Sequence, residues 1–173
     1  MPAGGGTPVT IGTGFTFPNG VAVDAAGNVY VADLGNDAVK KIAVSGGATT
    51  TLHSGYSSPT GVGVDASGNV FVVDATNTLY ELPATGAAQV TVATGFVSPQ
   101  SVTVDPAGNI YIANAGGNTI QKVFAGTTTV TLYPYTFFYP TGIAVDNKGD
   151  VLIADEIDEH LSLIHIFTIG CLV

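Results

Sequence analysis

Short apolar runs separated by tight-turn residues occupy most of the chain. Within residues 61–93, four such runs follow one another at 61–65, 69–73, 77–82 and 89–93. None of them has the three- and four-residue apolar spacing that predicts a helix. The first two runs are joined through the sequence DASGN, in which aspartate opens a tight hairpin and glycine allows a positive φ. The pattern therefore predicts a unit of four antiparallel strands.

This unit occurs four times with nearly constant spacing. The units start near residues 17, 58, 98 and 139, and Pro18, Pro59, Pro99 and Pro140 are 41, 40 and 41 residues apart. A period near 40 residues with four strands per unit is typical of a β-propeller blade. The first two strands of each unit are almost wholly apolar, which indicates that neighbouring blades cover both of their faces. We expect an all-β propeller of about four blades, each with four antiparallel strands.

Two acidic positions and one aromatic position repeat together with the blades. They are Asp24, Asp65, Asp105 and Asp146 at the hairpins, Asp33, Asp74 and Asp155 at the strand ends, and Phe15, Tyr56, Phe96 and Phe137 before the prolines. An aspartate that opens a turn accepts hydrogen bonds from loop amides, and an aromatic side chain between blades packs as a wedge. We expect structural roles for all of them, because a Ca²⁺ site needs six or more converging oxygen ligands.

The repeated segments are FPNGVAVDAAGNVYVAD, SPTGVGVDASGNVFVVD, SPQSVTVDPAGNIYIAN and YPTGIAVDNKGDVLIAD. They resemble the NHL repeat family over roughly residues 8–158. The third segment departs from the pattern, with Gln100 and Ser101 in place of Thr-Gly and Asn114 in place of the strand-end aspartate. The resemblance implies a propeller of about six blades, so four units would form an open arc of a larger ring. A closed four-blade ring, with residues 8–12 as an added outer strand, is the alternative.

The last 13 residues, LSLIHIFTIGCLV, differ from the repeat in composition and period. Residues 161–166 look like a translated sequencing adapter. We expect the repeats to occupy residues 1–160 of a truncated metagenomic fragment and residues 161–173 to be a non-native tail, so that the fourth unit loses its third and fourth strands. A hydrophobic C-terminal strand is the alternative.

Charge and cysteine content exclude several kinds of partner. Four Lys or Arg stand against 13 Asp or Glu, a net charge of −9, whereas nucleic acids bind clustered cations. We expect no nucleic-acid partner, no membrane insertion because no apolar stretch approaches about 20 residues, and no cofactor. The single cysteine and the one histidine securely within the repeats, His53, disfavour metal sites and a Ser-His-Asp triad.

The segment 133–139, YPYTFFY, departs most from the repeat. Its surplus aromatic residues are Tyr133, Tyr135, Phe138 and Tyr139, at positions where other blades have Ser, Gly, Val or His. The strand order places this crossover on one face, with the turns that follow the strand-end aspartates. The aromatic residues predict a stacking platform for a sugar ring or a peptide. Alternatively, they cover an apolar seam or pack on a further blade.

The sequence favours a non-enzymatic module that binds a protein or carbohydrate ligand, in a secreted or cell-surface bacterial protein. The expected compartment is extracellular, at the cell surface or periplasmic. Exposed blade edges would permit self-association. The alternative function is a fragment of a propeller lyase or hydrolase whose catalytic residues lie in other blades.

Overall fold

The computed structural model describes residues 9–44, 48–132, 137–146, 148–157 and 160–167, with side chains described up to residue 156. Within these residues the chain forms four antiparallel sheets and two short 3₁₀ turns, and no α-helix. None of the described helical segments is long and apolar enough to cross a membrane.

Each sheet contains strands that are consecutive along the chain. The first has β1 (Pro18–Val23), β2 (Val29–Asp33), β3 (Ala38–Ile42) and β4 (Thr50–Ser54). The second has β5 (Gly61–Val64), β6 (Val70–Val73), β7 (Thr78–Leu82) and β8 (Val90–Thr94). The third has β9 (Pro99–Val104), β10 (Ile110–Asn114), β11 (Thr119–Val123) and β12 (Val130–Leu132), and the fourth has β13 (Pro140–Val145), β14 (Val151–Ile157) and β15 (His160–Phe167).

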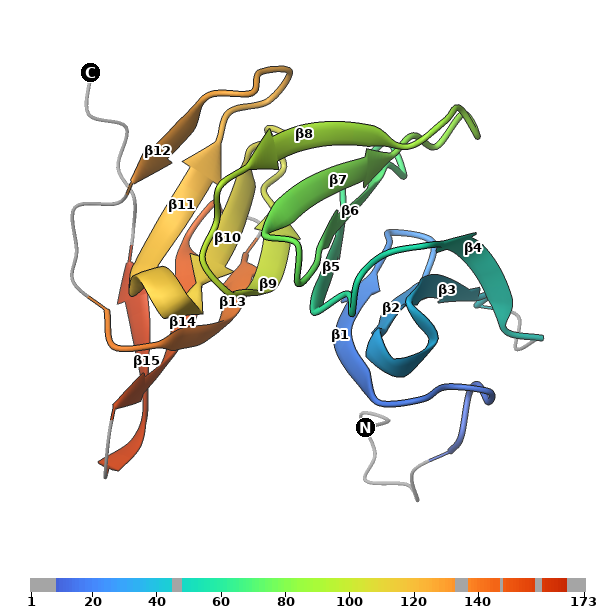
Figure 1. The fold of residues 1–173 in the computed structure, drawn as a ribbon, viewed down its shortest axis with the longest axis horizontal. Helices are drawn as coiled ribbons and strands as arrows, with labels where there is room; N and C mark the ends of the chain where they lie inside the picture. Colours follow the sequence, from blue (N-terminus) through green and yellow to red (C-terminus); the bar gives the residue numbers. More distant parts are fainter. Residues whose placement is uncertain (1–8, 45–47, 133–136, 147, 158–159, 168–173) are drawn as a thin grey trace.

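The four sheets are the blades of an open propeller arc (Figure 1). The inner strands contact one another in the order β1, β5, β9 and β13, so successive blades lie side by side. No hydrogen-bonded sheet joins the described strands of the first and fourth blades. The expected four-bladed all-β arc is therefore confirmed.

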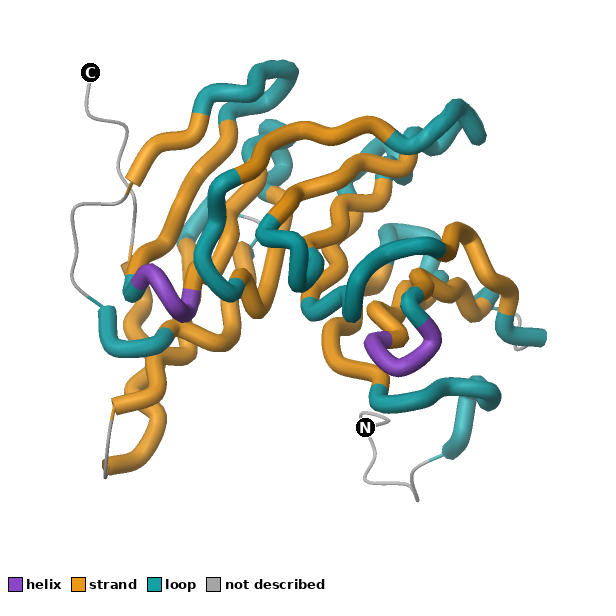
Figure 2. The backbone as a smooth tube through the Cα atoms, viewed as in Figure 1, coloured by secondary structure: helices purple, strands orange, loops and turns teal. Residues whose placement is uncertain are grey.

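Turn geometry follows directly from the repeated residues. In the hairpin between the first two strands of each blade, Gly27, Gly68, Gly108 and Gly149 have φ between 85° and 87°. Glycine adopts this conformation without steric cost. At the opposite end of the blades, the 3₁₀ turns η1 (Leu34–Asn36) and η2 (Ala115–Gly117) connect the second and third strands (Figure 2). The hairpins therefore lie on one face of the arc, and the 3₁₀ turns of the first and third blades lie on the other.

The core consists of three apolar clusters, one at each junction between successive blades. At the first junction, Tyr30, Ala32 and Val39 of the first blade surround Val62 and Val72 of the second. Burying such side chains contributes about 1.5 to 3 kcal/mol each. Most of the stabilisation therefore arises between blades rather than within them.

The alternative of a closed ring with residues 8–12 as an added outer strand is not supported, because the described residues 9–12 form no strand. Two expectations about the ends of the chain are wrong. The backbone of 160–167 pairs with β14 as β15, so the fourth blade keeps a third strand, because the edge of β14 offers unpaired backbone groups. The inner strand β1 is not covered on both faces. The assignment of residues 161–173 as a non-native tail stays a prediction.

Candidate functional site

The crossovers between blades lie on the same face as η1 and η2, which we call the crossover face. Each crossover is tied to the turn of the blade that it enters. The backbone N–H of Gly35 donates to the carbonyl of Thr16 (2.8 Å), and that of Gly116 donates to Val97 (2.9 Å). These contacts hold the crossover loops in a fixed orientation on the scaffold.

The residue at the end of the second strand anchors the same loops. Its side-chain oxygen accepts the backbone N–H of the crossover, at 2.7 Å for Asp33, 3.0 Å for Asp74, 2.6 Å for Asn114 and 2.9 Å for Asp155. All four residues are buried. The repeated strand-end position therefore binds the loop backbone and leaves no carboxylate turned toward a ligand.

Asp33 also pairs with a lysine. The carboxylate lies 2.5 Å from the ammonium group of Lys40 and accepts a hydrogen bond from Asn36 (2.6 Å). Burial acts to raise the pKa of Asp33, but these partners and the crossover amide outweigh it and hold the pKa below the ordinary value of 3.8. The group therefore stays ionised at neutral pH and fixes the loop.

The hairpin aspartates lie on the opposite face and bind their own turns. Asp105 accepts hydrogen bonds from the amides of Ala107 (2.9 Å) and Asn109 (2.8 Å), and from the Tyr111 hydroxyl (3.0 Å). Burial acts to raise the pKa of this carboxyl, but the hydrogen bonds lower it overall. Asp24, Asp65 and Asp146 accept the equivalent two amides. All four hairpin aspartates therefore have their partners within the turn.

The repeated aromatic residues seal the blade junctions. Tyr56, Phe96 and Phe137 are buried, whereas Phe15, which precedes the first blade, is half-buried and lies 5.4 Å from the ammonium group of Lys40. The hydroxyl of Tyr56 is buried without a hydrogen-bond partner. This position therefore accepts a phenylalanine as readily as a tyrosine.

Exposed aromatic side chains gather in the crossovers. Phe138 is 60% exposed and Tyr139 46%, and Phe17, which occupies the position of Tyr139 in the first blade, is 78% exposed. Phe17 and Tyr139 also share a positive φ, 50° and 65°, which L-residues seldom adopt. Tyr133 and Tyr135, the other aromatic residues predicted for this site, lie outside the described residues. The described part of the site is thus spread over two crossovers.

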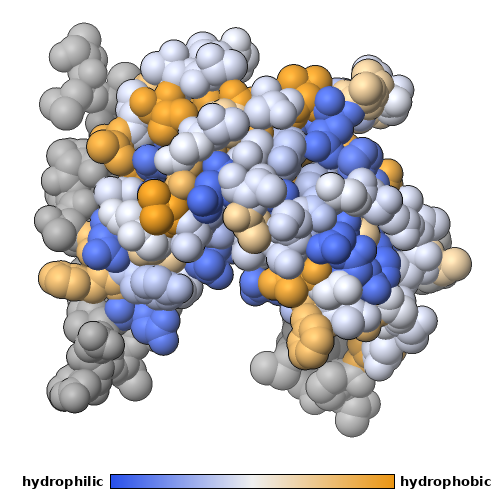
Figure 3. All heavy atoms as spheres, in the orientation of Figure 1, coloured by the Kyte–Doolittle hydropathy of each residue, from blue (hydrophilic) through white to orange (hydrophobic). Residues whose placement is uncertain are grey.

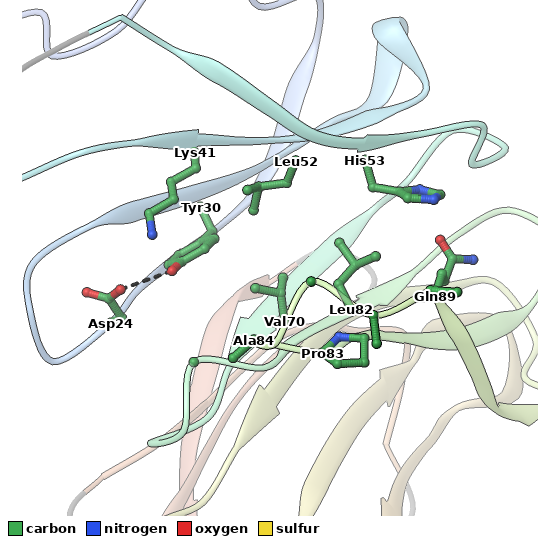
Figure 4. Close-up of a pocket in the computed structure, with 14 residues that line it drawn as sticks. Asp24, Tyr30, Lys41, Leu52, His53, Val70, Leu82, Pro83, Ala84 and Gln89 are labelled. Carbon is green, nitrogen blue, oxygen red and sulfur yellow. Dashed lines mark hydrogen bonds between the residues drawn. The ribbon is translucent and has the colours of Figure 1, made fainter.

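A groove of about 650 Å³ separates the outer parts of the first two blades (Figure 4). Lys41, Tyr30 and Asp24 lie at one end of it, and His53 and Gln89 lie at the other. The Tyr30 hydroxyl donates to Asp24 (3.0 Å), and the Lys41 ammonium lies 5.1 Å from the Tyr30 ring. At that end of the groove, the hydroxyl of Tyr30 is thus paired with Asp24, and Lys41 lies over the Tyr30 ring.

At the other end, His53 Nδ1 and Gln89 Oε1 are buried without hydrogen-bond partners. The half-buried His53 ring packs edge-on against Tyr56, with the ring centroids 5.2 Å apart. A second groove, of about 740 Å³, lies between the second and third blades. Because the grooves recur where blades splay apart, their volume alone marks no site.

This polar cluster beside Tyr56 was not predicted from the sequence. At the first blade junction His53 stands where the second junction has Ala93, and Tyr80 stands where the second junction has Gln121. Tyr56 and Tyr80 rings meet edge-on at 5.6 Å, and the Tyr80 hydroxyl lies 3.2 Å from the hydroxyl of Thr76. The signal was available as a departure from the repeat. Among the described residues, no group of three His, Cys, Asp or Glu side chains could hold a metal ion.

Comparison with known proteins supports the assignment of the repeat. Residues 15–42 match the NHL repeat family. No curated protein has a significant sequence match to the chain. The fold is shared with many solved structures.

One similar structure is that of a nidogen/laminin complex, with a TM-score of 0.73 and 22% identity over 80% of this chain and 56% of the other. Virginiamycin B lyase from Staphylococcus aureus has a TM-score of 0.67 and 18% identity, over 90% and 56%. Hydrazine synthase from Kuenenia stuttgartiensis has a TM-score of 0.71 and 14% identity, over 94% and 48%. The chain thus spans about half the length of these structures, and at such identities the likeness shows the fold alone.

Proposed function

We propose a binding function for this chain, which is an NHL-repeat β-propeller protein. It is a non-enzymatic module of a secreted or cell-surface bacterial protein, and its crossover face binds a protein or carbohydrate ligand. The observation that carries the proposal is the exposure of Phe17, Phe138 and Tyr139 in equivalent crossovers of a rigid scaffold. Exposed aromatic rings are costly to leave in water and supply large contact areas to sugars and peptides.

The remaining features agree with this function. The side-chain oxygens of the strand-end residues accept hydrogen bonds from the crossover backbone, so these residues hold the loops rather than the ligand. They are Asp33, Asp74, Asn114 and Asp155. A net charge of −9 with four cationic residues disfavours nucleic acid. One structural neighbour is a complex of nidogen with laminin, which supports a protein-binding role for a propeller of this kind.

The test is a double substitution at the crossover face. We would screen the wild-type protein on a glycan array and a peptide array, and then measure the affinity for the best hit by calorimetry. The F138A/Y139A variant should bind at least about tenfold more weakly, since aromatic anchors dominate such interfaces. Both side chains are largely exposed, so the thermal midpoint should hardly change.

The matched control is F124A. Phe124 is 42% exposed, yet it follows β11 at the hairpin end of the blade, and its removal should leave binding unchanged. Equal affinity of wild type and a folded F138A/Y139A variant would contradict the proposal. A wild-type protein that binds no member of either array would also contradict it. So would turnover, in a mass-spectrometric assay, of quinupristin, the compound with which a catalytically inactive virginiamycin B lyase of similar fold was crystallised.

A further inference from the structure

The second blade differs from both of its neighbours at one pair of facing residues. In the first and third blades, a tyrosine of the second strand stands opposite a lysine of the third strand. The pairs are Tyr30 with Lys41 and Tyr111 with Lys122. Each ammonium group lies over its ring, 5.1 and 4.9 Å from the centroid, as Figure 4 shows for the first blade. In the second blade the pair is Phe71 with Glu81, so a carboxylate stands where the flanking blades have a cation.

The same exchange removes a hydrogen bond from the hairpin aspartate. In the first and third blades the tyrosine hydroxyl donates to Oδ2 of that aspartate, at 3.0 Å in both. Phe71 has no hydroxyl, so within the described residues Oδ2 of Asp65 accepts only the side chain of Asn69 (2.8 Å). No ion pair in the described part of the chain involves Glu81. The second blade therefore has two carboxylates with capacity for a further donor.

Both carboxylates line the groove of about 740 Å³ between the second and third blades. Asp65 and Glu81 are half-buried there, which reduces the screening of their charge by salt. Phe71, Val90 and Val92 line the same groove and give it apolar walls. In the space-filling view, apolar and hydrophilic surface lie side by side over the second and third blades (Figure 3). A ligand that matches this lining has an apolar stem and a cationic end.

We propose that the groove between the second and third blades binds a primary alkylammonium group, such as a lysine side chain of a peptide or a free diamine. The methylene chain lies against Phe71 and Val92, and the ammonium group pairs with Glu81. An ammonium group has three N–H donors, so it also supplies the hydrogen bond that Asp65 lacks. The flanking blades place their own lysines at this position. The net charge of −9 further favours the approach of a cation.

The test is a titration of the isotope-labelled protein followed by NMR. The probes are Nα-acetyl-lysine amide, cadaverine and the uncharged analogue Nα-acetyl-norleucine amide. The lysine probe should shift the backbone signals of Glu81 and Val92 saturably, with a dissociation constant of about 1 mM. The norleucine probe should bind at least about fivefold more weakly, because it lacks the ammonium group. Binding of cadaverine but not of the lysine probe would identify the ligand as a free amine rather than a peptide.

Variants locate the site on the second blade. E81Q should weaken binding of the lysine probe at least about fivefold. The matched control is E156Q, which changes the net charge equally at an exposed position of the fourth blade and should bind as the wild type does. F71Y/E81K rebuilds the residue pair of the first and third blades. This double variant should fold and bind no probe, since its own lysine and hydroxyl take the place of the ligand.

The proposal would be overturned by equal affinity of the wild type for the lysine and norleucine probes, or by the absence of saturable shifts at the groove. Equal affinity of the wild type and a folded E81Q for the lysine probe would also overturn it. If E81Q does not fold, the comparison of the two probes on the wild type still decides. The F138A/Y139A variant should bind the lysine probe unchanged, so this inference and the proposed binding function fail independently.

Discussion

The hairpins on one face of the propeller are almost the same in all four blades, whereas the strand ends on the crossover face differ from blade to blade. In every hairpin the aspartate Oδ1 accepts the amides two and four residues on, at 2.8 to 3.0 Å. In three blades an asparagine side chain also donates to Oδ2, and in the fourth Asp150 replaces that asparagine. This constancy is what a turn requires of its own residues, independently of any partner.

On the crossover face, the charge at the strand end changes with its neighbours. Asp33 faces Lys40, whereas Asn114 is found in the blade that has Gln121 at the lysine position. Asp74 forms no ion pair within the described residues, and it accepts hydrogen bonds from the amide (3.0 Å) and the hydroxyl (2.5 Å) of Thr76. Across the blades, the hydrogen bond from the crossover N–H to the strand-end side chain is therefore constant, whereas the charge and the other partners of that side chain differ.

The largest effect on stability should come from the removal of a hairpin aspartate. D105A leaves two amides, the Asn109 side chain and the Tyr111 hydroxyl without the carboxylate that they contact. We expect a loss of about 2 to 3 kcal/mol in the free energy of unfolding at pH 7, measured with urea.

The pH dependence gives an independent check of the same hairpin. The pKa of Asp105 is lowered below 3.8 in the folded state, so its stabilisation is fully present above that value and is lost as the pH falls through the lowered pKa. The gap between wild type and D105A should therefore narrow below about pH 3.8. A gap that is the same at pH 7 and pH 3 would contradict this account. D146A, which removes fewer hydrogen bonds, should cost less.

A smaller effect should follow from exchanging strand ends between blades. N114D places a buried carboxylate opposite Gln121 and removes the amide that donates to Thr119 (3.1 Å). We expect a cost of about 1 to 2 kcal/mol, measured by urea unfolding.

Adding Q121K should restore most of that loss, because it recreates the pairing of Asp33 with Lys40 and removes Gln121 Oε1, which is buried without a partner. The matched control is Q121K alone, which should not stabilise the wild type to the same extent. A double variant as unstable as N114D would show that the two positions are not coupled.

The sequence was sufficient for the elements that depend on local residues. Each hairpin follows from an aspartate and a glycine three residues later, so strands such as β5 and β6 were predicted to within one residue. Exposure could not be predicted in this way. Val21 and Val62 stand in the same sequence pattern, and only the presence of a preceding blade makes one of them buried.

The full set of exposed aromatic residues on the crossover face could not be predicted either. The predicted platform rested on the extra aromatic residues of a single segment. In the structure Phe138 and Tyr139 of that segment are exposed, and so is Phe17, which lies in a different crossover. The strand β15 lies in a segment that does not resemble the repeat. Its pairing depends on a free strand edge, which sequence periodicity does not report.

The smallest effect on stability, and one of opposite sign, should come from Tyr56, the aromatic wedge at the first blade junction. The Tyr56 hydroxyl is buried without a partner, and burial, together with Asp74 and Tyr80, raises its pKa, so it stays neutral. Phe96 and Phe137 fill the same position without a hydroxyl. Y56F should therefore leave the free energy of unfolding unchanged or raise it by up to about 1 kcal/mol. Thermal unfolding of the variant and the wild type measures the difference.

The reciprocal variant F96Y tests the effect of the hydroxyl group separately from the packing of the aromatic ring. It adds a hydroxyl at a junction where Ala93 and Gln121 replace His53 and Tyr80, so we expect a loss of about 1 to 2 kcal/mol, the cost of an unpaired buried polar group. If Y56F is instead destabilising by a similar amount, the hydroxyl has a partner in solution, and the polar cluster around His53 and Tyr80 becomes a site for an ordered water or a ligand. The pair of variants thus decides whether the first junction differs from the second only in packing or also in chemistry.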